Sequence, residues 1–335
     1  MSQSIRASLV GFSRGTHLSS ETLNSYIEQV FGGPTLEKDS QVVFVREDLE
    51  SLHEALVEFP DESIRVLFAS ELTGLNLNFF DYVIGWETSV VSDRYLRLPP
   101  AIRERWFFDN PMSIETIPMR ERRFCNFIYS NPKAHPFRDE FFHALNSKIG
   151  VDSLGKHLNN FPIPENVREA KLHWGHEKIL LQSRYKFSLA FENGTYDGYT
   201  TEKLITASLA GSIPIYWGNP RVALDFNPKR FVSLHDFVSP EKAIEFIIEL
   251  SNDEDQLREM AAQPLITEDQ SRELVANEAR LLDFLQMIKS SASSGQSFRP
   301  RGTTASESKR LLLEMYKYLN RIRVIKSILG RHYRR

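Results

Sequence analysis

The sequence has little of what would place it in an oxidising compartment, in a membrane or on nucleic acid. Its one cysteine, Cys125, cannot form an internal disulfide, which fits a reducing compartment. No stretch approaches the ~20 apolar residues that a membrane-spanning helix needs, and residues 1–10 lack the apolar core of a signal peptide. The net charge of −3 does not indicate a basic nucleic-acid binder. These absences predict a soluble cytoplasmic protein.

What is present is the composition of an ordinary globular protein. The chain has 335 residues, of which 41% are apolar and 25% charged, so it has room for two domains with sizeable cores. Apolar runs at Gln41–Arg46, Ile64–Ala69 and Phe80–Gly85 predict strands, and Leu49–Phe59 has helical spacing. Continuous apolar runs separated by helical stretches are typical of a parallel sheet covered on both faces.

The same pattern returns after Arg97–Met119, a proline-rich segment for which we expect irregular structure. We therefore predict one domain over residues 1–118 and a second over 119–290. In the second domain we expect strands at Phe124–Tyr129, Phe187–Phe191, Ser212–Trp217 and Arg230–Leu234, and helices over Phe137–Lys148 and Thr201–Ala210.

The end of the chain changes character. Residues 291–305 are rich in Ser, Thr and Gly, which predicts a flexible linker. Residues 306–335 hold nine basic and two acidic side chains, a net charge of +7, so the rest of the chain carries 32 − 42 = −10. Apolar residues from Met315 to Leu329 recur there at helical spacing and predict a basic amphipathic helix. Such a helix lies on an anionic membrane surface, the interpretation we favour, or packs on the protein or on a second copy.

The most informative stretch is Phe187–Pro220, which reads as strand, loop, helix and strand. Its loop leaves the carboxyl end of a strand and enters a helix, which is where open parallel sheets bind ligands. A helix N-terminus suits a phosphate, and Lys203 would add a full positive charge. However, Glu202 is also an ordinary first-turn acid, and Gly194 and Gly198 are ordinary turn residues. From the residues alone, a ligand site and a plain turn both stay open.

Several motifs occur in a fixed order along the chain. Phe191-Glu-Asn193, then Tyr199 with Thr201-Glu-Lys203, and then Ile213–Gly218 resemble the signature of the α-1,3/4-fucosyltransferase family (glycosyltransferase family 10), most closely its bacterial members. The similarity runs from about Leu67 to Phe237 through further motifs: Phe80–Gly85, Asp93–Pro99, Phe124–Pro132, Arg138–Phe142, Leu145-Asn146 and Asp225–Lys229.

The resemblance implies a fold and a reaction. The fold is α/β of the GT-B type, with two Rossmann-like domains facing across a cleft, the first for the acceptor and the second for GDP-fucose. The reaction is an inverting transfer of L-fucose to a hydroxyl of N-acetylglucosamine or glucose in a surface glycan, through an α-1,3 or α-1,4 linkage. N-acetyllactosamine and lactose are representative acceptors. No cofactor and no metal are implied, because side chains can neutralise the leaving diphosphate.

The resemblance also implies roles for residues. Glu71, which follows the strand at Ile64–Ala69, matches the general base that takes the acceptor's proton. Without the resemblance it is a solvated carboxylate at a strand end. Arg138 and Lys203 match a pair that contacts the phosphates and stabilises the leaving GDP.

Three further residues match the family's donor site. Glu202 matches a second essential carboxylate, which stabilises oxocarbenium character on the fucose. Asn193 and Tyr199 match residues that line the nucleotide site. From the residues alone, they are a turn-forming amide and a half-buried loop aromatic.

Other signals are weaker. Asp253-Glu-Asp255 reads as a solvated helical face, and His173 with His176 lacks the further ligand that a metal site needs. One rival function is a GT-B transferase for another nucleotide sugar, with the same phosphate contacts and different residues around the sugar. Another is a non-enzymatic protein that binds membrane or nucleic acid through its tail, although the acidic remainder argues against nucleic acid.

Overall fold

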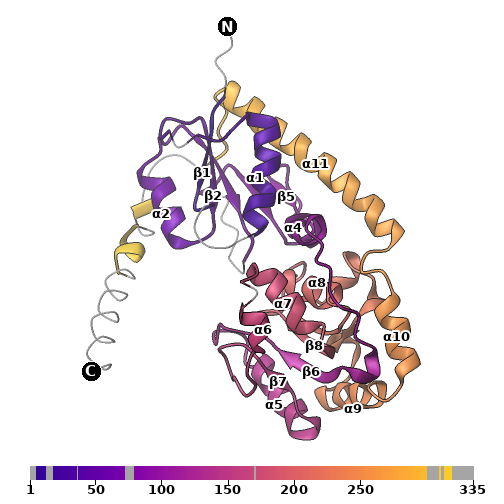
Figure 1. Ribbon diagram of the computed structural model, residues 1–335. Coiled ribbons are helices and arrows are strands. Elements are labelled where there is room, and N and C mark those ends of the chain that lie inside the picture. Colours follow the sequence, from indigo (N-terminus) through magenta and orange to yellow (C-terminus); the bar gives the residue numbers. More distant parts are fainter. Residues whose placement is uncertain are drawn as a thin grey trace. The chain divides into compact units, whose positions relative to one another are not determined.

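The computed structural model describes residues 5–12, 18–35, 37–71, 79–169, 171–299, 309–310 and 313–318. These residues form two compact units (Figure 1). The first unit is drawn from Met1–Gly85, Val90–Leu98 and Glu278–Arg335, and the second from Trp86–Ser89 and Pro99–Asn277.

The first unit is built on a parallel sheet in the order β1-β2-β3-β4-β5. The predicted strands in this region are confirmed as β2, β3 and β4, and the structure adds β1 and β5. The helix predicted from residue 49 is confirmed as α2, where the Asp48 carboxylate caps the Ser51 N–H at 2.9 Å. The elements are β1 (Ala7–Val10), α1 (Leu18–Phe31), β2 (Val42–Arg46), α2 (Leu49–Val57), β3 (Ile64–Phe68), β4 (Tyr82–Gly85) and β5 (Tyr95–Arg97).

The second unit has its own parallel sheet, in the order β10-β9-β8-β6-β7. All four strands predicted in this region are confirmed. They are β6 (Arg123–Phe127), β8 (Tyr185–Phe191), β9 (Ile213–Trp217) and the short β10 (Val232–Ser233), and β7 (Asp152–Ser153) completes the sheet.

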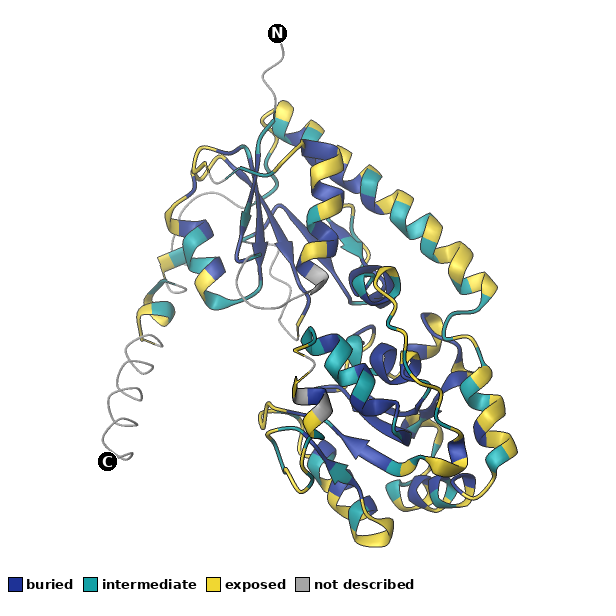
Figure 2. Ribbon diagram, viewed as in Figure 1, coloured by how far each residue is buried: buried dark blue, intermediate teal, exposed yellow. Residues whose placement is uncertain are grey.

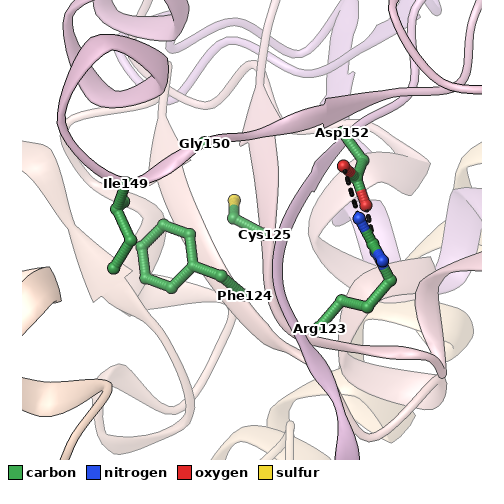
Figure 3. A pocket seen from close by; sticks show the side chains of 6 residues that line it. All are labelled: Arg123, Phe124, Cys125, Ile149, Gly150 and Asp152. Carbon is green, nitrogen blue, oxygen red and sulfur yellow. Dashed lines mark hydrogen bonds and ion pairs between the residues drawn. The ribbon is translucent and has the colours of Figure 1, made fainter.

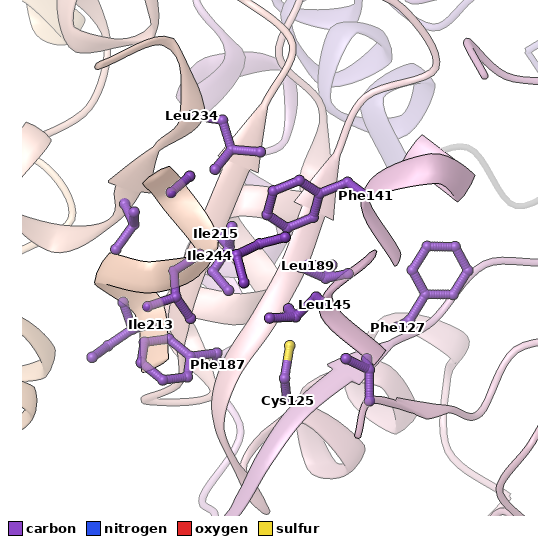
Figure 4. Packing of buried hydrophobic residues seen from close by; sticks show 14 of the residues in the cluster. Cys125, Phe127, Phe141, Leu145, Phe187, Leu189, Ile213, Ile215, Leu234 and Ile244 are labelled. Atoms are coloured by element: carbon purple, nitrogen blue, oxygen red, sulfur yellow. The ribbon is translucent and has the colours of Figure 1, made fainter. Parts of the chain in front are cut away.

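Helices cover the faces of this second sheet. The two predicted helices are confirmed as α5 and α8. Phe141 and Leu145 of α5 and Ile244 of α9 pack with strand residues in one apolar cluster, and Cys125 lies within it (Figure 4). Figure 2 shows the result, with strands that are mostly buried and helices that are exposed on their outer sides. The helices are α5 (Phe137–Ile149), α6 (Glu165–Glu169), α7 (Trp174–Gln182), α8 (Glu202–Leu209), α9 (Pro240–Leu250), α10 (Glu254–Ala262) and α11 (Glu268–Ser293), with short 3₁₀ turns between them.

The proline-rich segment is more ordered than predicted. The expectation of irregular structure is wrong for its first half, which contains α3 (Pro100–Arg103) and α4 (Trp106–Asp109). Pro100 occupies the first position of α3, where a proline's fixed φ favours a helix instead of ending it. Arg103 and Phe107 are buried in the second unit. The structure therefore starts that unit's main segment at Pro99, whereas the sequence places the division at 118/119.

Residues 278–290 belong to the first unit, not to the second as the sequence predicts. The described residues that follow, which include the end of α11 and fall in the predicted flexible linker, belong to the first unit as well. Asp81, a buried carboxylate beside β4, accepts hydrogen bonds from Ser297 Oγ (2.8 Å), Phe298 N (2.8 Å), Arg299 N (3.1 Å) and Arg299 Nε (2.7 Å). Residues 296–299, in the predicted linker, are thus tied to the first sheet, while 300–308 lie outside the described residues.

Replacing Arg299 with glutamine should lower the unfolding free energy by about 2 kcal/mol at pH 7, as expected for loss of a hydrogen bond to a buried charge. Burial raises the pKa of Asp81, but the Arg299 guanidinium and the N–H and O–H donors outweigh it and hold that pKa below its ordinary value. The pair's contribution is therefore complete above the unfolded pKa, near 4, and is lost as the pH falls below it.

Denaturant titrations of the wild type and of Arg299→Gln, at pH 7 and at pH 3.5, check this prediction. The matched control is Lys309→Gln, because Lys309 pairs at 2.9 Å with Asp61 at the protein surface. An exposed pair is worth no more than about 1 kcal/mol. Equal losses in the two variants, or a loss for Arg299→Gln that grows as the pH falls, would contradict the role given to Asp81.

Part of the predicted tail helix is described. Residues 309–310 and 313–318 are helical, and the Tyr316 ring stacks on His53 of α2 with ring centroids 3.9 Å apart. The rest of residues 306–335 lies outside the described residues. Within the described part of the chain, no helix has the length and apolarity to cross a bilayer.

Candidate active site

The second sheet contains a point where its connections diverge. Since β6 lies between β7 and β8, the chain moves outward from β6 to β7 on one side and from β8 through β9 to β10 on the other. In open parallel sheets, ligands bind at the carboxyl ends of the two strands beside such a switch point. The segments that follow β6 and β8 hold every predicted site residue except Glu71.

Lys203, in the first turn of α8, is directed toward a buried carboxylate. Its Nζ donates to Glu192 Oε2 at 3.1 Å and to Thr201 Oγ1 at 2.7 Å. Glu192, fully buried directly after β8, also accepts from Thr201 N and Thr201 Oγ1, both at 2.7 Å. Burial lowers the pKa of Lys203, but Glu192 and Glu202 outweigh it and raise that pKa well above its ordinary value.

This arrangement changes the interpretation of the helix terminus. Lysine in a first turn opposes the helix dipole, and the sequence alone suggests an external anion to compensate for it. The structure shows an internal anion, because the Glu192 carboxylate takes both the Lys203 amine and the Thr201 N–H. Any phosphate bound here would therefore contact a lysine that is already paired, through the one N–H of Lys203 that Glu192 and Thr201 do not use.

Glu202 lies between two amines. Its Oε1 accepts from Lys178 Nζ of α7 at 3.2 Å, and its Oε2 lies 3.8 Å from Lys203 Nζ. Burial by itself raises the pKa of Glu202, but the charges of Lys203 and Lys178 outweigh burial and leave that pKa far below its ordinary value. Glu202 is thus a carboxylate held in its ionised form within the protein.

A third carboxyl group adjoins this cluster. Glu104, which ends α3, accepts from Arg103 Nε at 3.2 Å. Burial raises the pKa of Glu104 to about 7, and the negative charge of Glu202 contributes to the rise while Arg103 opposes it. The site therefore contains one carboxyl that is ionised at all ordinary pH values and one that titrates near neutrality.

Arg138 is held on several sides. Its Nε donates to Asp139 Oδ1 at 3.2 Å and its Nη2 to the Asn131 carbonyl at 2.8 Å, and the guanidinium lies 4.7 Å from the Tyr129 ring centroid. Its buried Nη1 has no hydrogen-bond partner among the described residues. A guanidinium fixed in this way with one unsatisfied nitrogen is suited to an anion with a matching oxygen.

Asn193 and Tyr199 belong to the loop between β8 and α8. The Asn193 carbonyl accepts from His135 N at 2.9 Å, which joins this loop to the segment before Arg138. Tyr199 is fully buried, with its ring edge-on to Trp86 at 5.3 Å. Gly198 has φ +94°, and a Cβ there would lie 2.1 Å from the Trp86 carbonyl oxygen, so only glycine fits this approach.

Glu71 belongs to the first unit, whereas the residues above belong to the second. It is exposed, three residues after the end of β3, and its N–H donates to Glu47 Oε1 at 3.0 Å. Ser70 Oγ donates to the same oxygen at 2.7 Å, so Glu47 holds the backbone that carries Glu71. An accessible carboxylate on a fixed backbone is compatible with a base and with a plain surface charge.

The residues set aside as metal ligands have structural roles. The His173 ring caps α7 by accepting from Gly175 N at 3.2 Å, and His176 Nε2 lies 3.0 Å from the Asn110 carbonyl oxygen. Asp253 caps α10 by accepting from Gln256 N. No group of three His, Cys, Asp or Glu side chains in the described part of the chain is placed to hold a metal ion.

A hollow of about 300 Å³ lies elsewhere on the second unit (Figure 3). Phe124, Cys125 and Ile149 line it, and the Arg123–Asp152 ion pair closes one side. These residues lie at the amino ends of β6 and β7, whereas the candidate site lies at the carboxyl ends. The hollow contains none of the predicted site residues.

Three residues of the cluster are not predicted as site residues from the sequence: Glu192, Lys178 and Glu104. Glu192 carries a usable signal, because it is an acid directly after an apolar strand and lies inside the motif Phe191-Glu-Asn193. Lys178 carries none, since it is 24 residues before Glu202 on a different helix. Glu104 lies in the segment expected to be irregular.

Comparisons with known proteins match this region. Residues 118–261 match the family described as Glycosyltransferase family 10 (fucosyltransferase) C-term. The chain is 35% identical over 217 residues to alpha-(1,3)-fucosyltransferase FucT of Helicobacter pylori, covering 55% of this chain and 43% of that protein. It is 27% identical over 255 residues to the putative fucosyltransferase R654 of Acanthamoeba polyphaga mimivirus, covering 74% and 40%. The chain thus spans about two-fifths of the length of these curated relatives.

Solved structures extend the likeness over most of the chain. An alpha1,3-fucosyltransferase crystal structure superposes with a TM-score of 0.65 at 27% identity, covering 83% of this chain and 90% of that one. A crystal structure of alpha1,3-fucosyltransferase with GDP-fucose gives 0.63 at 26% identity, with the same coverage. The predicted fold class, with two parallel α/β units of GT-B type, and the resemblance to glycosyltransferase family 10 are confirmed.

Proposed function

We propose that this chain, whose residues 118–261 carry the C-terminal domain of glycosyltransferase family 10, is a fucosyltransferase that uses GDP-fucose as donor. The acceptor is a hydroxyl of N-acetylglucosamine or glucose in a glycan, and the linkage is α-1,3 or α-1,4. The observation that carries the proposal is the buried cluster of Lys203, Glu202 and Glu192 inside the matched domain, at the switch point of its sheet.

The proposed reaction is a single displacement that inverts the anomeric centre. The acceptor oxygen forms a bond to C1 of fucose as the bond from C1 to the phosphate oxygen breaks, and GDP leaves with that electron pair. Glu71 takes the acceptor's proton. Arg138 Nη1 and a remaining N–H of Lys203 stabilise the charge that develops on the diphosphate. Glu202, held ionised, stabilises positive charge on the fucose ring.

Two predicted donor contacts remain, Asn193 and Tyr199, and the loop between β8 and α8 positions both. Tyr199 and Asn193 would line the nucleotide site from the loop whose shape Gly198 makes possible.

Side chains alone neutralise the diphosphate in this proposal, so we expect turnover without a divalent metal. Addition of a chelator to the assay tests that expectation.

A GDP-release assay tests the function. GDP-fucose is supplied with N-acetyllactosamine, lactose or a type 1 chain disaccharide, and release is compared with GDP-mannose and a UDP-sugar as donors. Acceptor-dependent release from GDP-fucose alone supports the proposal, and the preferred disaccharide indicates the linkage. Release from a different donor would identify a transferase of another specificity, and no binding of GDP-fucose would exclude the proposal.

We also propose that residues 306–335 attach the protein to the anionic cytoplasmic face of a membrane. The net charge of +7 supports this, as does the exposure of Met315 and Tyr318. We expect the full chain to sediment with phosphatidylserine vesicles at low salt and a chain ending at residue 305 to stay in the supernatant. A full chain that remains in the supernatant would refute the attachment.

A further inference from the structure

Lys178 is an amine that the proposed reaction does not use, although it is directed into the donor cluster. Its side chain is 12% exposed, and its Nζ reaches Glu202 Oε1 at 3.2 Å. Burying an ammonium group is costly unless it meets an opposite charge. Burial lowers the pKa of Lys178, and Lys203 adds to that effect, whereas Glu202 opposes it. The Glu202 carboxylate is thus the opposite charge that offsets the cost of burying the Lys178 amine.

The α7 helix places Lys178 through close packing. His173 caps the helix, and the Trp174 ring lies edge-on to Phe107 with centroids 5.9 Å apart. At Gly175 a Cβ would come within 2.6 Å of the Phe107 ring, so glycine permits this close approach. One turn further along α7, Lys178 reaches α8 and Glu202. The packing of α7 therefore determines where the amine lies.

The distances divide the cluster into two pairs. Lys203 Nζ is 3.1 Å from Glu192 and 3.8 Å from Glu202, whereas Lys178 Nζ is 3.2 Å from Glu202. Each carboxylate therefore has one amine as its nearer partner, and the four charges sum to zero. Without Lys178, the only amine close to Glu202 among the described residues would be Lys203, which is already bound to Glu192 and Thr201.

We propose that Lys178 is a positioning residue that holds one oxygen of Glu202, so that Glu202 faces the fucose. The proposal rests on the proposed function. It predicts that Lys178 affects the transfer step through Glu202, and that GDP, which has no fucose, binds largely without its help.

The test compares Lys178→Met, Lys178→Arg and the control Lys186→Met. Lys186, on β8, is likewise partly buried, but its Nζ donates to the Ser251 carbonyl at 2.9 Å, and Ser251 is not among the site residues. We expect Lys178→Met to lower kcat 10- to 100-fold with the Kd for GDP unchanged within threefold. Lys178→Arg should recover part of kcat, and Lys186→Met should match the wild type.

The pH profile of kcat gives a readout that a purely structural role would not move. The charged groups around Glu202 are Lys178, Lys203, Glu192, Glu104 and Arg103. Loss of the Lys178 charge raises the pKa of Glu202, so the ratio of the Lys178→Met kcat to the wild-type kcat should fall as the pH is lowered. A ratio that stays constant with pH would count against the proposal.

A double-mutant cycle covers the case in which Lys178→Met folds poorly. Lys178→Met/Glu202→Gln removes both charges and leaves neither buried alone. If Lys178 acts through Glu202, adding Lys178→Met to Glu202→Gln causes no further loss of kcat. An additional tenfold loss would overturn the proposal. If the wild type itself fails to release GDP, the proposed function has failed; if it turns over and Lys178→Met equals it, only this inference has failed.

Discussion

Replacing Lys203 with methionine should weaken GDP binding about 10- to 100-fold, since a charge-assisted hydrogen bond to a phosphate contributes about 1.5–3 kcal/mol. The same change should lower the unfolding free energy by about 3–5 kcal/mol, because it leaves the Glu192 carboxylate buried without its cation. Titration calorimetry with GDP measures the first effect, and chemical denaturation measures the second.

The two effects can be separated by a second variant. Glu192→Gln/Lys203→Met removes both charges, and a glutamine still offers an oxygen to the Thr201 N–H and an amide to the Thr201 hydroxyl. We expect this variant to regain most of the lost stability while its affinity for GDP stays low. If GDP affinity returns together with stability, Lys203 is a structural residue and its assignment to the diphosphate is wrong.

Replacing Glu71 with glutamine should reduce acceptor-dependent GDP release by about 10²- to 10⁴-fold, the usual contribution of a general base. The Kd for GDP should not change, because Glu71 belongs to the first unit and the proposed donor contacts belong to the second. Release is measured at saturating acceptor and GDP-fucose, and binding of GDP by calorimetry.

Strand β3 supplies the matched control for this experiment. Glu62 lies just before its amino end and Glu71 just after its carboxyl end, and both are exposed. Glu62→Gln removes an equal charge from the end of the strand where the proposal places no chemistry. Retained turnover in Glu71→Gln, or equal losses in both variants, would remove Glu71 as the base.

Much of the fold follows from local sequence patterns. The runs that form β2, β3, β4, β6, β8 and β9 are rich in apolar residues, so they indicate buried parallel strands without tertiary information. Helices α2, α5 and α8 follow from helical spacing and from capping residues such as Asp48. The division between units does not follow in this way, because it depends on which sheet a segment packs against. Pro99–Pro118 and the end of α11 illustrate this.

The same distinction between local sequence pattern and tertiary packing applies to the candidate site. The sequence by itself determined that Arg138, Asn193, Tyr199, Glu202 and Lys203 occur in segments after strands, because motif order and strand ends are properties of neighbouring residues. Only the tertiary structure decided which charges meet: that Lys203 pairs with Glu192, that Lys178 reaches Glu202 from α7, and that Glu104 adjoins them. These pairings depend on how α3, α4, α7 and α8 pack together. That packing is set by side-chain contacts such as those of Gly175 and Phe107, which lie 68 residues apart in the chain, and no local pattern encodes them.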